Sequence, residues 1–426
     1  MFSLDALPRP SDKRLALKAT PAAERQLRKR HPWLYDGGIT SGADGGKPGD
    51  LAVIFDKKRA FLAIGLFDPD SPISVRVLHH GKPATIDSGW WRSTIADAYD
   101  RRRSLITSSG ERATTGYRLV NGENDSLPGL IVDRYDHVLV VKLYSQAWFP
   151  HLRDVLPALV AEADAAGAPV DRVVLRLART VQQQAQRRSD VAGLHDGLVL
   201  DAETFQPAAL DEPVVFSENG LLFESYPIRG QKTGHFLDQR DNRQRVRERA
   251  HGARVLDVFS CTGGFSVYAA AGGARSVHSM DLAGEAIETA KRNMALNPAT
   301  STTHLQTTVG DAFEVMASMA DRGERYDIVI VDPPSFARKQ GDVPRALSAY
   351  RRLTKLALDL VESDGLLVQA SCSSRIPSAE FFDTVLDAAA DAGVEFDDVT
   401  ETGHALDHPA TFAEGYYLKA LFARRR

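Results

Sequence analysis

The chain has 426 residues, of which 43% are hydrophobic and 25% are charged, so its composition excludes a wholly disordered chain and its length predicts several domains. Lys and Arg total 52 and Asp and Glu total 56, and the resulting formal charge of −4 excludes nucleic-acid binding through an overall positive charge. The two cysteines, Cys261 and Cys372, are too few for a disulfide-rich secreted scaffold or a four-cysteine zinc site.

The N-terminal residues predict a small β-rich domain, because short strand-like segments alternate with turns that contain glycine and proline. Strands are expected at Leu51–Phe55, Phe61–Phe67 and Ile73–Leu78. A basic segment before them contains Arg28 and Arg30, whose charges suit contacts with RNA phosphates. We assign this domain to residues 1–83.

Residues 84–210 predict an α+β domain that begins with a linker helix. Hydrophobic residues recur at helical spacing between Asp87 and Ile106 and indicate that helix. The stretch Arg179–Asp190 is rich in Gln and Arg and is expected to form a solvated loop. The other expected elements are strands at Tyr117–Asn121, Leu130–Asp133, Val138–Tyr144 and Val173–Leu177, and a helix over 146–166.

Residues 211–426 predict a β-hairpin followed by a Rossmann-like, doubly wound sheet. In the hairpin, Asn219-Gly220 separates two hydrophobic runs within Val214–Ser225, and this pair favours a tight primed turn. Strand and helix patterns then alternate, which is typical of a mostly parallel sheet. Strands are expected at Arg254–Phe259, Ser276–Asp281, His304–Val309, Asp327–Asp332, Gly365–Ser371 and Tyr416–Phe422. The whole chain is therefore expected to be a multidomain α/β protein.

Four predicted strands of the last domain end in residues that suit a ligand. The first strand contains Asp257 and runs into a glycine turn at 261–264, where backbone can approach a ligand closely. Asp281 ends the second strand, where an acidic side chain can accept both hydroxyls of a ribose. Asp311 follows the third strand and Asp332 ends the fourth. Because the carboxyl ends of parallel strands share one edge, these groups should line one binding site.

This succession of motifs resembles the class I S-adenosylmethionine (SAM)-dependent methyltransferases. The segments Gly230–Arg240 (GQKTGHFLDQR) and Leu127–Tyr135 (LPGLIVDRY) look more specifically like the bacterial large-subunit ribosomal RNA cytosine-C5 methyltransferases with an N-terminal PUA domain. The resemblance covers nearly the whole chain. It implies a PUA-like RNA-binding domain at the N-terminus, SAM as the cofactor and large-subunit ribosomal RNA as the substrate.

The resemblance also implies the residues of the site. The implied cofactor-binding residues are Lys232, Thr233, Phe236, Asp257, Thr262, Gly263, Asp281 and Asp311. Among them, Asp281 would hold the ribose and Asp311 would meet the adenine. The residues expected to contact the RNA are Pro333, Pro334, Ser335 and Phe336 next to the target base, and Arg28 and Arg30 in the basic segment.

Cys372 is the expected catalytic nucleophile, with Asp332 as the second catalytic residue. C5 of cytosine is a poor nucleophile, but a thiolate that adds at C6 makes C5 enamine-like, so that C5 can attack an activated methyl group. Cys372 follows the predicted fifth strand and should lie beside Asp332 on the fourth. Asp332 suits a hydrogen bond to the N3/N4 edge of the base, and Arg375 could favour the thiolate. Cys261 is interpreted as a packing residue.

Two features leave alternatives open. Pro333 stands where another group of RNA cytosine-C5 enzymes carries a second cysteine, so the base that removes the C5 proton is open between Ser335, a water and a neighbouring carboxylate. Asp-Pro-Pro also occurs in methyltransferases of exocyclic nitrogens, although here Ser335 precedes the aromatic Phe336. The alternatives are therefore methylation of a purine nitrogen in ribosomal RNA, and a non-catalytic role in RNA binding or ribosome assembly.

The remaining expectations concern location and partners. The N-terminus lacks a signal-peptide pattern and no apolar run reaches membrane-spanning length, so a cytoplasmic protein without a membrane partner is expected. His404 and His408 lack Cys or Glu partners at a ligand spacing, so no metal is expected. The resemblance is compatible with a homodimer.

Overall fold

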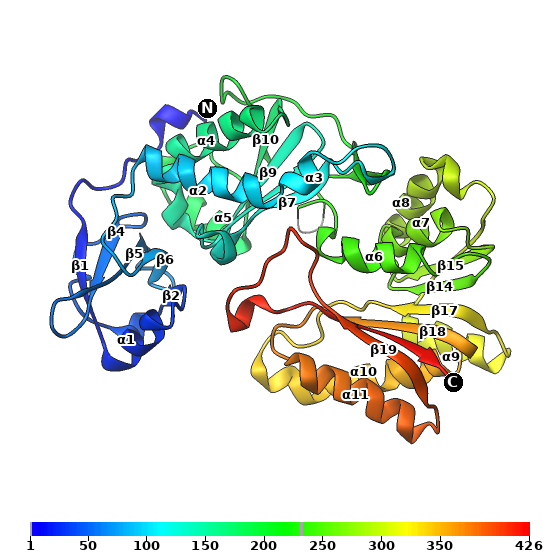
Figure 1. Ribbon diagram of the computed structural model, residues 1–426. Coiled ribbons are helices and arrows are strands. Elements are labelled where there is room, and N and C mark those ends of the chain that lie inside the picture. The colour runs from blue at the N-terminus through cyan, green and yellow to red at the C-terminus, as the bar shows by residue number, and fades with distance from the viewer. Residues whose placement is uncertain (1, 231–232) are drawn as a thin grey trace. The chain divides into compact units, whose positions relative to one another are not determined.

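The computed structural model describes residues 2–230 and 233–426, which form two compact units (Figure 1). The first unit extends to Phe216 and includes Ser225–His235, and the second comprises Ser217–Glu224 and Phe236–Arg426. The predicted domain boundaries at 83/84 and 210/211 stay a prediction, and the first two predicted domains lie within one unit. None of the helices in the described ranges is long and apolar enough to cross a lipid bilayer.

The first unit begins with a six-stranded sheet in the order β2-β6-β5-β4-β1-β3. Its elements are β1 (Leu15–Ala19), α1 (Pro21–Arg28), β2 (Trp33–Leu34), β3 (Ile39–Ser41), β4 (Leu51–Phe55), β5 (Phe61–Phe67) and β6 (Val75–His80). The predicted β-rich fold and the bounds of β4 and β5 are confirmed. The third predicted strand begins at Val75 instead of Ile73, because the Ile73 N–H donates to Ser71 Oγ (3.2 Å) in a turn.

A five-stranded sheet follows, in the order β11-β10-β9-β8-β7. Its elements are α2 (Ser88–Arg101), α3 (Arg103–Ile106), β7 (Gly116–Asn121), β8 (Leu130–Tyr135), β9 (Val138–Leu143), α4 (Leu152–Ala165), β10 (Arg172–Leu177), α5 (Arg179–Gln186) and β11 (Leu198–Asp201). Buried polar contacts join it to the first sheet: Asp68 accepts hydrogen bonds from Ser145 Oγ (2.6 Å) and Gln146 Nε2 (3.2 Å). These contacts explain why both sheets belong to one unit.

The predicted linker helix is interrupted at Arg102. Asp87 caps its start by accepting a hydrogen bond from the Trp90 N–H (2.9 Å). Arg102 is fully buried, and its guanidinium donates to both carboxylate oxygens of Asp125, at 2.7 and 2.8 Å. The backbone leaves the helical conformation at this residue and α3 follows as a separate short helix.

The solvated loop expected at Arg179–Asp190 is a wrong prediction, because most of this stretch forms the helix α5. Val181 and Ala185 lie one helical turn apart and are buried in the core of the unit. Gln and Arg have good intrinsic helix propensity, so a polar composition does not by itself indicate a loop.

The predicted hairpin is formed by β12 (Val214–Glu218) and β13 (Leu221–Ser225). Asn219 and Gly220 adopt φ angles of 48° and 76°, both in the left-handed region that a primed two-residue turn requires. The hairpin is therefore confirmed together with its turn. Its tip, Ser217–Glu224, belongs to the second unit.

The second unit contains a seven-stranded sheet in the order β16-β15-β14-β17-β18-β20-β19. Its strands are β14 (Arg254–Val258), β15 (Ser276–Asp281), β16 (His304–Val309), β17 (Tyr326–Val331), β18 (Val361–Ser371), β19 (Phe396–Thr402) and β20 (Lys419–Arg425). The neighbours from β16 to β18 are parallel and β20 is antiparallel to β18 and β19, so the predicted Rossmann-like sheet is confirmed. The last strand begins at Lys419 instead of Tyr416, because Tyr417 lies in a loop and its hydroxyl donates to Asp238 (2.8 Å).

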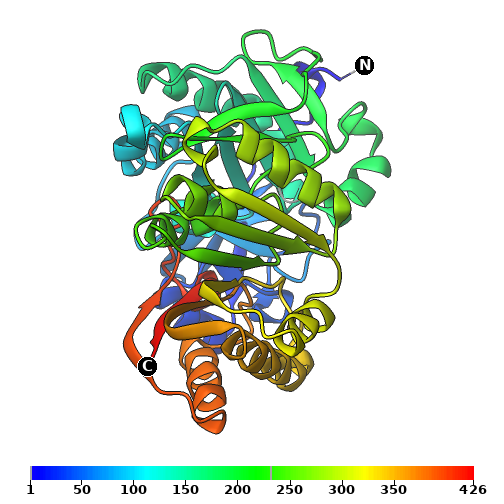
Figure 2. The same ribbon diagram turned by 90° about the vertical axis from the view of Figure 1, so that its right-hand side faces the viewer.

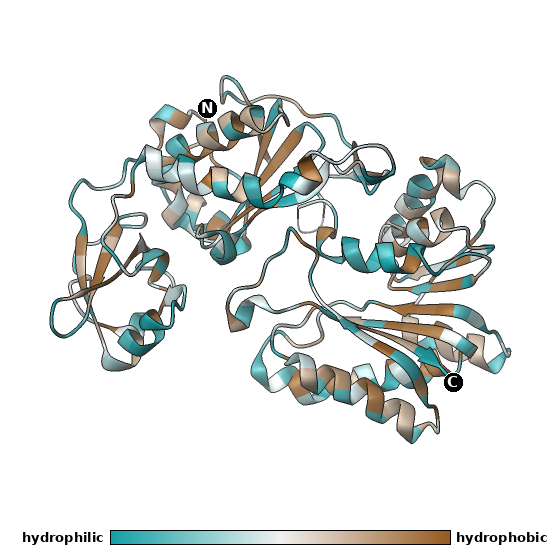
Figure 3. Ribbon diagram, in the orientation of Figure 1, coloured by the Kyte–Doolittle hydropathy of each residue, from teal (hydrophilic) through white to brown (hydrophobic). Residues whose placement is uncertain are grey.

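Helices cover both faces of this sheet (Figure 2). They are α6 (Arg240–Arg247), α7 (Gly264–Ala271), α8 (Gly284–Ala295), α9 (Ala312–Asp321), α10 (Val343–Leu358) and α11 (Ser378–Asp391). One group comprises α6 to α8 and the other α9 to α11. Apolar side chains such as Met316, Tyr350 and Phe381 fill the space between the second group of helices and the strands. The strands themselves are largely brown in Figure 3, which marks them as hydrophobic.

Candidate active site

The strand β14 runs into a turn at the carboxyl edge of the sheet. Phe259, Cys261 and Gly263 have left-handed backbone conformations, with φ of 62°, 48° and 78°. A Cβ atom at Gly263 would lie 2.8 Å from the Cβ of Ala290, so glycine is needed for α7 to pack against α8. Cys261 and Thr262 are left partly exposed at the tip of this turn.

Asp281 closes the turn from the neighbouring strand β15. Its Oδ2 accepts a hydrogen bond from the Cys261 N–H and its Oδ1 accepts one from the Ala283 N–H, both at 2.9 Å. Each carboxylate oxygen has a second lone pair, so Asp281 can still accept hydrogen bonds from ribose hydroxyls. Its expected position at the end of β15 is confirmed, and its role in binding ribose stays a prediction.

Asp257 lies deeper in the same edge and is buried. Its Oδ2 accepts a hydrogen bond from Ser266 Oγ (2.6 Å), whereas its Oδ1 is buried without a hydrogen-bond partner. Burial raises the pKa of Asp257 to about 7, because the hydrogen bond from Ser266 compensates only in part and the charges of Asp332 and Asp281 add to the increase. The negative charges of Asp257, Asp281 and Asp332 therefore repel one another at this edge of the sheet, and a cationic ligand would relieve that repulsion.

The adenine side of the expected site is less polar. Leu282 and Val309, next to Asp281 and Gly310, expose 72% and 57% of their surface. Asp311 caps α9 by accepting hydrogen bonds from the N–H groups of Phe313 (2.9 Å) and Glu314 (3.3 Å). The buried Asp257 oxygen without a hydrogen-bond partner fits the ammonium and sulfonium of SAM, the partly exposed carboxylate of Asp281 fits the ribose, and the apolar surface fits the adenine.

The raised pKa of Asp257 predicts opposite effects of pH on stability and on cofactor binding. The folded state holds a proton that the unfolded state loses near pH 4, so stability should fall as the pH rises from 4 to 7. Asp257→Asn should remove this penalty and stabilise the cofactor-free protein at pH 8 by about 2–4 kcal/mol, with no gain near pH 4. Denaturation by urea at several pH values measures this difference.

Cationic SAM should bind more tightly to the ionised form of Asp257. From pH 8 to pH 6 we expect the affinity for SAM to fall about tenfold in the wild type beyond any change in Asp257→Asn. The variant is the matched control, because titration of SAM itself affects both proteins equally. Equal pH dependence of the two calorimetric binding constants would contradict the assignment of Asp257.

Three of the implied cofactor-binding residues, Lys232, Thr233 and Phe236, come before α6. The two that the structure describes belong to different units. Lys232 lies outside the described residues. Thr233 is buried in the first unit, where its hydroxyl donates to Asp133 and lies 3.2 Å from the hydroxyl of Tyr135. Phe236 begins the longer segment of the second unit, and its carbonyl accepts a hydrogen bond from Arg243 (2.9 Å). Contacts of these residues with the cofactor stay predictions.

Cys372 lies beside the Asp-Pro-Pro motif, as expected. The strands β17 and β18 pair in parallel with Val331 opposite Gln369, which brings their carboxyl ends to the same edge. The Sγ of Cys372 lies 3.9 Å from the carbonyl oxygen of Pro333. Asp332 and Cys372 are both partly exposed, so a ligand can reach either side chain. Their catalytic roles stay predictions.

The segment around Cys372 is held by hydrogen bonds from both sides. Before it, Ser371 Oγ accepts a hydrogen bond from the Tyr350 hydroxyl (2.9 Å). After it, Ser373 Oγ donates to the carbonyl of Ala337 (3.1 Å), which ties the segment to the loop after β17. Burial raises the pKa of Tyr350, and the charges of Cys372 and Asp332 raise it further, so this phenol stays protonated.

The residues after Asp332 differ in their exposure. Pro333 is buried, Pro334 is exposed, and Ser335 and Phe336 are partly buried. The Ser335 hydroxyl donates to the carbonyl of Ala337 (3.3 Å). The Phe336 ring lies 5.2 Å from the ring of Tyr350 and packs against the core, so a structural role accounts for much of its surface.

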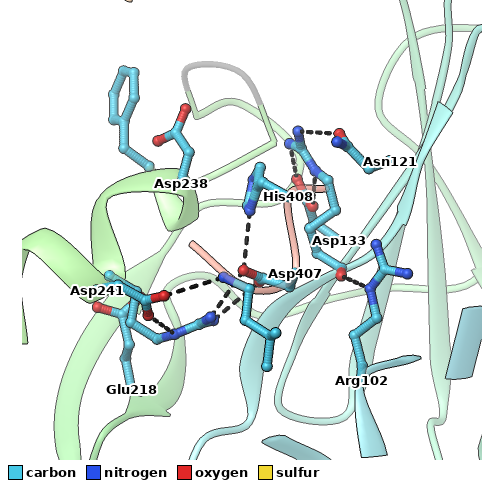
Figure 4. A network of polar contacts seen from close by, with 12 residues as sticks. Arg102, Asn121, Asp133, Glu218, Asp238, Asp241, Asp407 and His408 are labelled. Atoms are coloured by element: carbon cyan, nitrogen blue, oxygen red, sulfur yellow. Dashed lines mark hydrogen bonds and ion pairs between the residues drawn. The ribbon is translucent and has the colours of Figure 1, made fainter. Parts of the chain in front are cut away.

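A loop before the last strand was expected from the sequence, but sequence reasoning missed the buried charges that dock it between β19 and β20 (Figure 4). Asp407 accepts hydrogen bonds from two nitrogens of Arg240, at 2.9 and 3.0 Å, and all three partners Arg240, Asp407 and His408 are buried. Burial alone would raise the pKa of Asp407, but the charges of Arg240 and His408 outweigh it and hold that pKa far below its usual range. Across the described residues, no cluster of three His, Cys, Asp or Glu side chains could hold a metal ion.

The two arginines expected to contact RNA lie at the carboxyl end of α1. Arg28 is in the last turn of α1 and forms an ion pair with Asp56 (2.8 Å). Arg30 is exposed in a left-handed conformation (φ 63°) just after that helix. Both side chains reach solvent, and their contact with RNA stays a prediction.

Comparison with known proteins shows the family of this chain. A family model described as S-adenosylmethionine-dependent methyltransferase matches residues 169–402, and one for a PUA-like domain matches residues 17–80. A Ribosomal RNA large subunit methyltransferase from Deinococcus radiodurans is 46% identical over 97% of this chain and 98% of its own. A Ribosomal RNA large subunit methyltransferase I from Shewanella frigidimarina is 35% identical over 96% and 99% of the two chains.

A solved structure from Streptococcus mutans, assigned as a SAM-dependent methyltransferase, aligns with a TM-score of 0.76 over 96% of this chain and all of its own, at 21% identity. At that identity the alignment supports the fold alone. The curated relatives match over nearly their entire length, and the family model covers more than half of the chain. This chain therefore belongs to the family of SAM-dependent methyltransferases with a PUA-like N-terminal domain that includes these two relatives.

Proposed function

We propose that this methyltransferase transfers a methyl group to C5 of a cytosine in large-subunit ribosomal RNA, with Cys372 as a covalent nucleophile. The names of the two relatives support ribosomal RNA as the substrate. The observation that carries the choice of cytosine is the partly exposed thiol of Cys372 beside Pro333, at the same sheet edge as the turn after β14. A ribosomal RNA substrate would make the cytoplasm the site of the reaction.

The chemistry begins at the thiolate of Cys372. Its sulfur forms a bond to C6 of cytosine, and the electron pair of the C5–C6 double bond becomes available at C5. When bound, SAM supplies an electrophilic methyl group on a sulfonium. C5 takes that methyl group as the methyl–sulfur bond breaks, which leaves S-adenosylhomocysteine. A base then removes the C5 proton, the double bond re-forms, and the electron pair of the S–C6 bond returns to Cys372.

Asp332 suits recognition of the base in this scheme. A carboxyl at the end of β17 can bond with the N3 and N4 positions of cytosine, and a protonated carboxyl would also relieve charge in the adduct. The base that accepts the C5 proton is open between Ser335, a water and a nearby carboxylate. The target cytosine must leave the RNA stack to reach this edge, which favours an unpaired or flipped nucleotide. Arg28 and Arg30 are proposed to bind RNA phosphates.

Nucleoside analysis tests the proposed product. Ribosomal RNA from cells that lack this enzyme should be incubated with the purified protein and SAM that carries a labelled methyl group, then digested and analysed by mass spectrometry. We expect the label in 5-methylcytidine. Label solely in a methylated purine would contradict the proposal and favour transfer to a purine nitrogen. No transfer, together with intact RNA binding, would favour an assembly role.

A further inference from the structure

Lys419 is a buried cation at the base of the candidate active site that sequence reasoning did not find. It is the first residue of β20 and exposes only 1% of its surface. A lysine is rarely this buried unless its charge is paired or its three donors are bonded. No carboxylate accepts a hydrogen bond from Lys419 in the described contacts, and its bonds go to backbone carbonyls.

The register of the sheet brings Lys419 to the nucleophile. In the antiparallel pair of β18 and β20, Lys419 lies directly opposite Ser371, the residue before Cys372. Opposed residues of such a pair project to the same face of the sheet. Ser371 accepts its hydrogen bond from Tyr350 of α10 on that face, so Lys419 extends beneath the turn that follows Cys372.

The ammonium of Lys419 holds that turn together. It donates hydrogen bonds to the carbonyls of Ser373 and Ile376 (2.6 Å for the latter), and a longer one to the carbonyl of Tyr417 (3.3 Å). Three donors thus meet three acceptors, as a protonated lysine requires. Two of these acceptors lie one and four residues after Cys372, so the ammonium fixes the path of the chain that carries the thiol.

We infer that Lys419 is a positioning residue for Cys372, holding the turn after the nucleophile and favouring its thiolate through the buried positive charge. Reactive cysteines lie in electropositive, partly exposed surroundings. Cys372 is partly exposed, and a protonated Lys419 adds a positive charge that acts on it. The inference deepens the proposed function and rests on it for the role of Cys372. Arg375, which the sequence suggested for this task, is exposed to solvent.

Two other groups near the thiol do not favour a thiolate. Asp332 is negatively charged and precedes Pro333, whose carbonyl oxygen lies 3.9 Å from the sulfur of Cys372, and Tyr350 of α10 has a raised pKa and carries no charge. Burial lowers the pKa of Lys419 to about 8, while the negative charge of Cys372 acts in the opposite direction. Near neutral pH the lysine is therefore still mostly protonated.

Alkylation of the thiol in the absence of RNA tests the inference. The rate at which iodoacetamide modifies Cys372 should be followed against pH by peptide mass spectrometry, which separates Cys372 from Cys261. In the wild type we expect the midpoint of the rate below that of a free cysteine, about pH 8.5. In Lys419→Gln, which can still donate hydrogen bonds but carries no charge, the rate at pH 7 should fall about tenfold. Lys419→Arg should restore much of it.

Lys355→Gln on α10 is the matched control, because that lysine is exposed and its nearest acid, Asp391, is at 3.7 Å. In this variant, iodoacetamide should modify Cys372 at the wild-type rate. A wild-type midpoint at or above that of free cysteine overturns the inference, even if the Lys419 variants fail to fold. An alkylation rate of Cys372 in Lys419→Gln that equals the wild-type rate also overturns the inference. If 5-methylcytidine is not the product while Lys419 still controls alkylation, the proposed function fails and the inference about the thiol stands.

Discussion

Cys372→Ala should lower the rate of cytosine methylation by at least roughly a thousandfold, because the variant cannot form the bond to C6 that activates C5. The rate is measured under single-turnover conditions with ribosomal RNA and labelled SAM. Affinity for SAM should not change, since the expected cofactor residues lie on the turn after β14 and at the ends of β15 and β16. Calorimetry with SAM checks that the variant is folded.

Cys261→Ala is the matched control for this prediction. Cys261 lies in the turn after β14, where its N–H donates to Asp281 and its thiol has no proposed role. We expect a rate within about tenfold of the wild type, since an alanine keeps the backbone hydrogen bond. A Cys372→Ala enzyme that still methylates cytosine at a tenth of the wild-type rate would exclude covalent catalysis by this residue.

Asp407→Ala should be among the most destabilising single substitutions in the second unit. The change leaves the guanidinium of Arg240, 1% exposed, without the carboxylate that binds two of its nitrogens. Removing one partner of such a buried pair costs about 3–5 kcal/mol. The double variant Arg240→Met with Asp407→Leu should lose less, because it removes both charges of this buried pair together.

The design of the measurement follows from the sequence. All four tryptophans, Trp33, Trp90, Trp91 and Trp148, lie in the first unit, so tryptophan fluorescence reports on that unit while circular dichroism reports on both. Unfolding by urea should show the Asp407→Ala loss in the dichroism signal. Asp391→Ala, which breaks the exposed pair with Arg351, is the control and should cost less than about 1 kcal/mol. An equally small loss for both variants would contradict the account.

The effect of pH on the Asp407 pair has a defined sign. The pKa of Asp407 is far lower in the folded protein than in the unfolded chain, so its contribution to stability is complete above the usual Asp pKa of about 3.9. It declines as the pH falls below that value. The loss in Asp407→Ala should therefore be smaller at pH 3 than at pH 5.

The sequence predicted the elements whose hydrophobic period is strong. The strands β4, β5, β15 and β16 have the predicted bounds, because each is a run of suitable residues between clear turn signals. Asn219-Gly220 predicted its hairpin, because few residue pairs adopt two left-handed conformations easily. Cys372 beside Asp332 followed from the strand order alone, since adjacent parallel strands end at the same edge.

The failures have a common physical cause, which is that tertiary contacts decided the local structure. The strand β19 escaped prediction because it is an edge strand with three acidic residues and little hydrophobic signal. The helix α5 is polar apart from Val181 and Ala185, which face the core. Lys419 could be recognised only once β20 was paired with β18, because a lysine in a strand reads as solvent-exposed until the register is known.

Trapping the covalent adduct tests the central claim most directly. Ribosomal RNA that contains 5-fluorocytidine should react with the wild-type enzyme and SAM until C5 carries both the methyl group and fluorine. No proton is then left at C5 to remove, so the enzyme stays bonded to C6. We expect a stable protein–RNA complex whose digestion yields the peptide of Cys372 joined to a methylated fluorocytidine. Formation of 5-methylcytidine on ordinary RNA without any such complex, or with one through Cys261, would contradict the account.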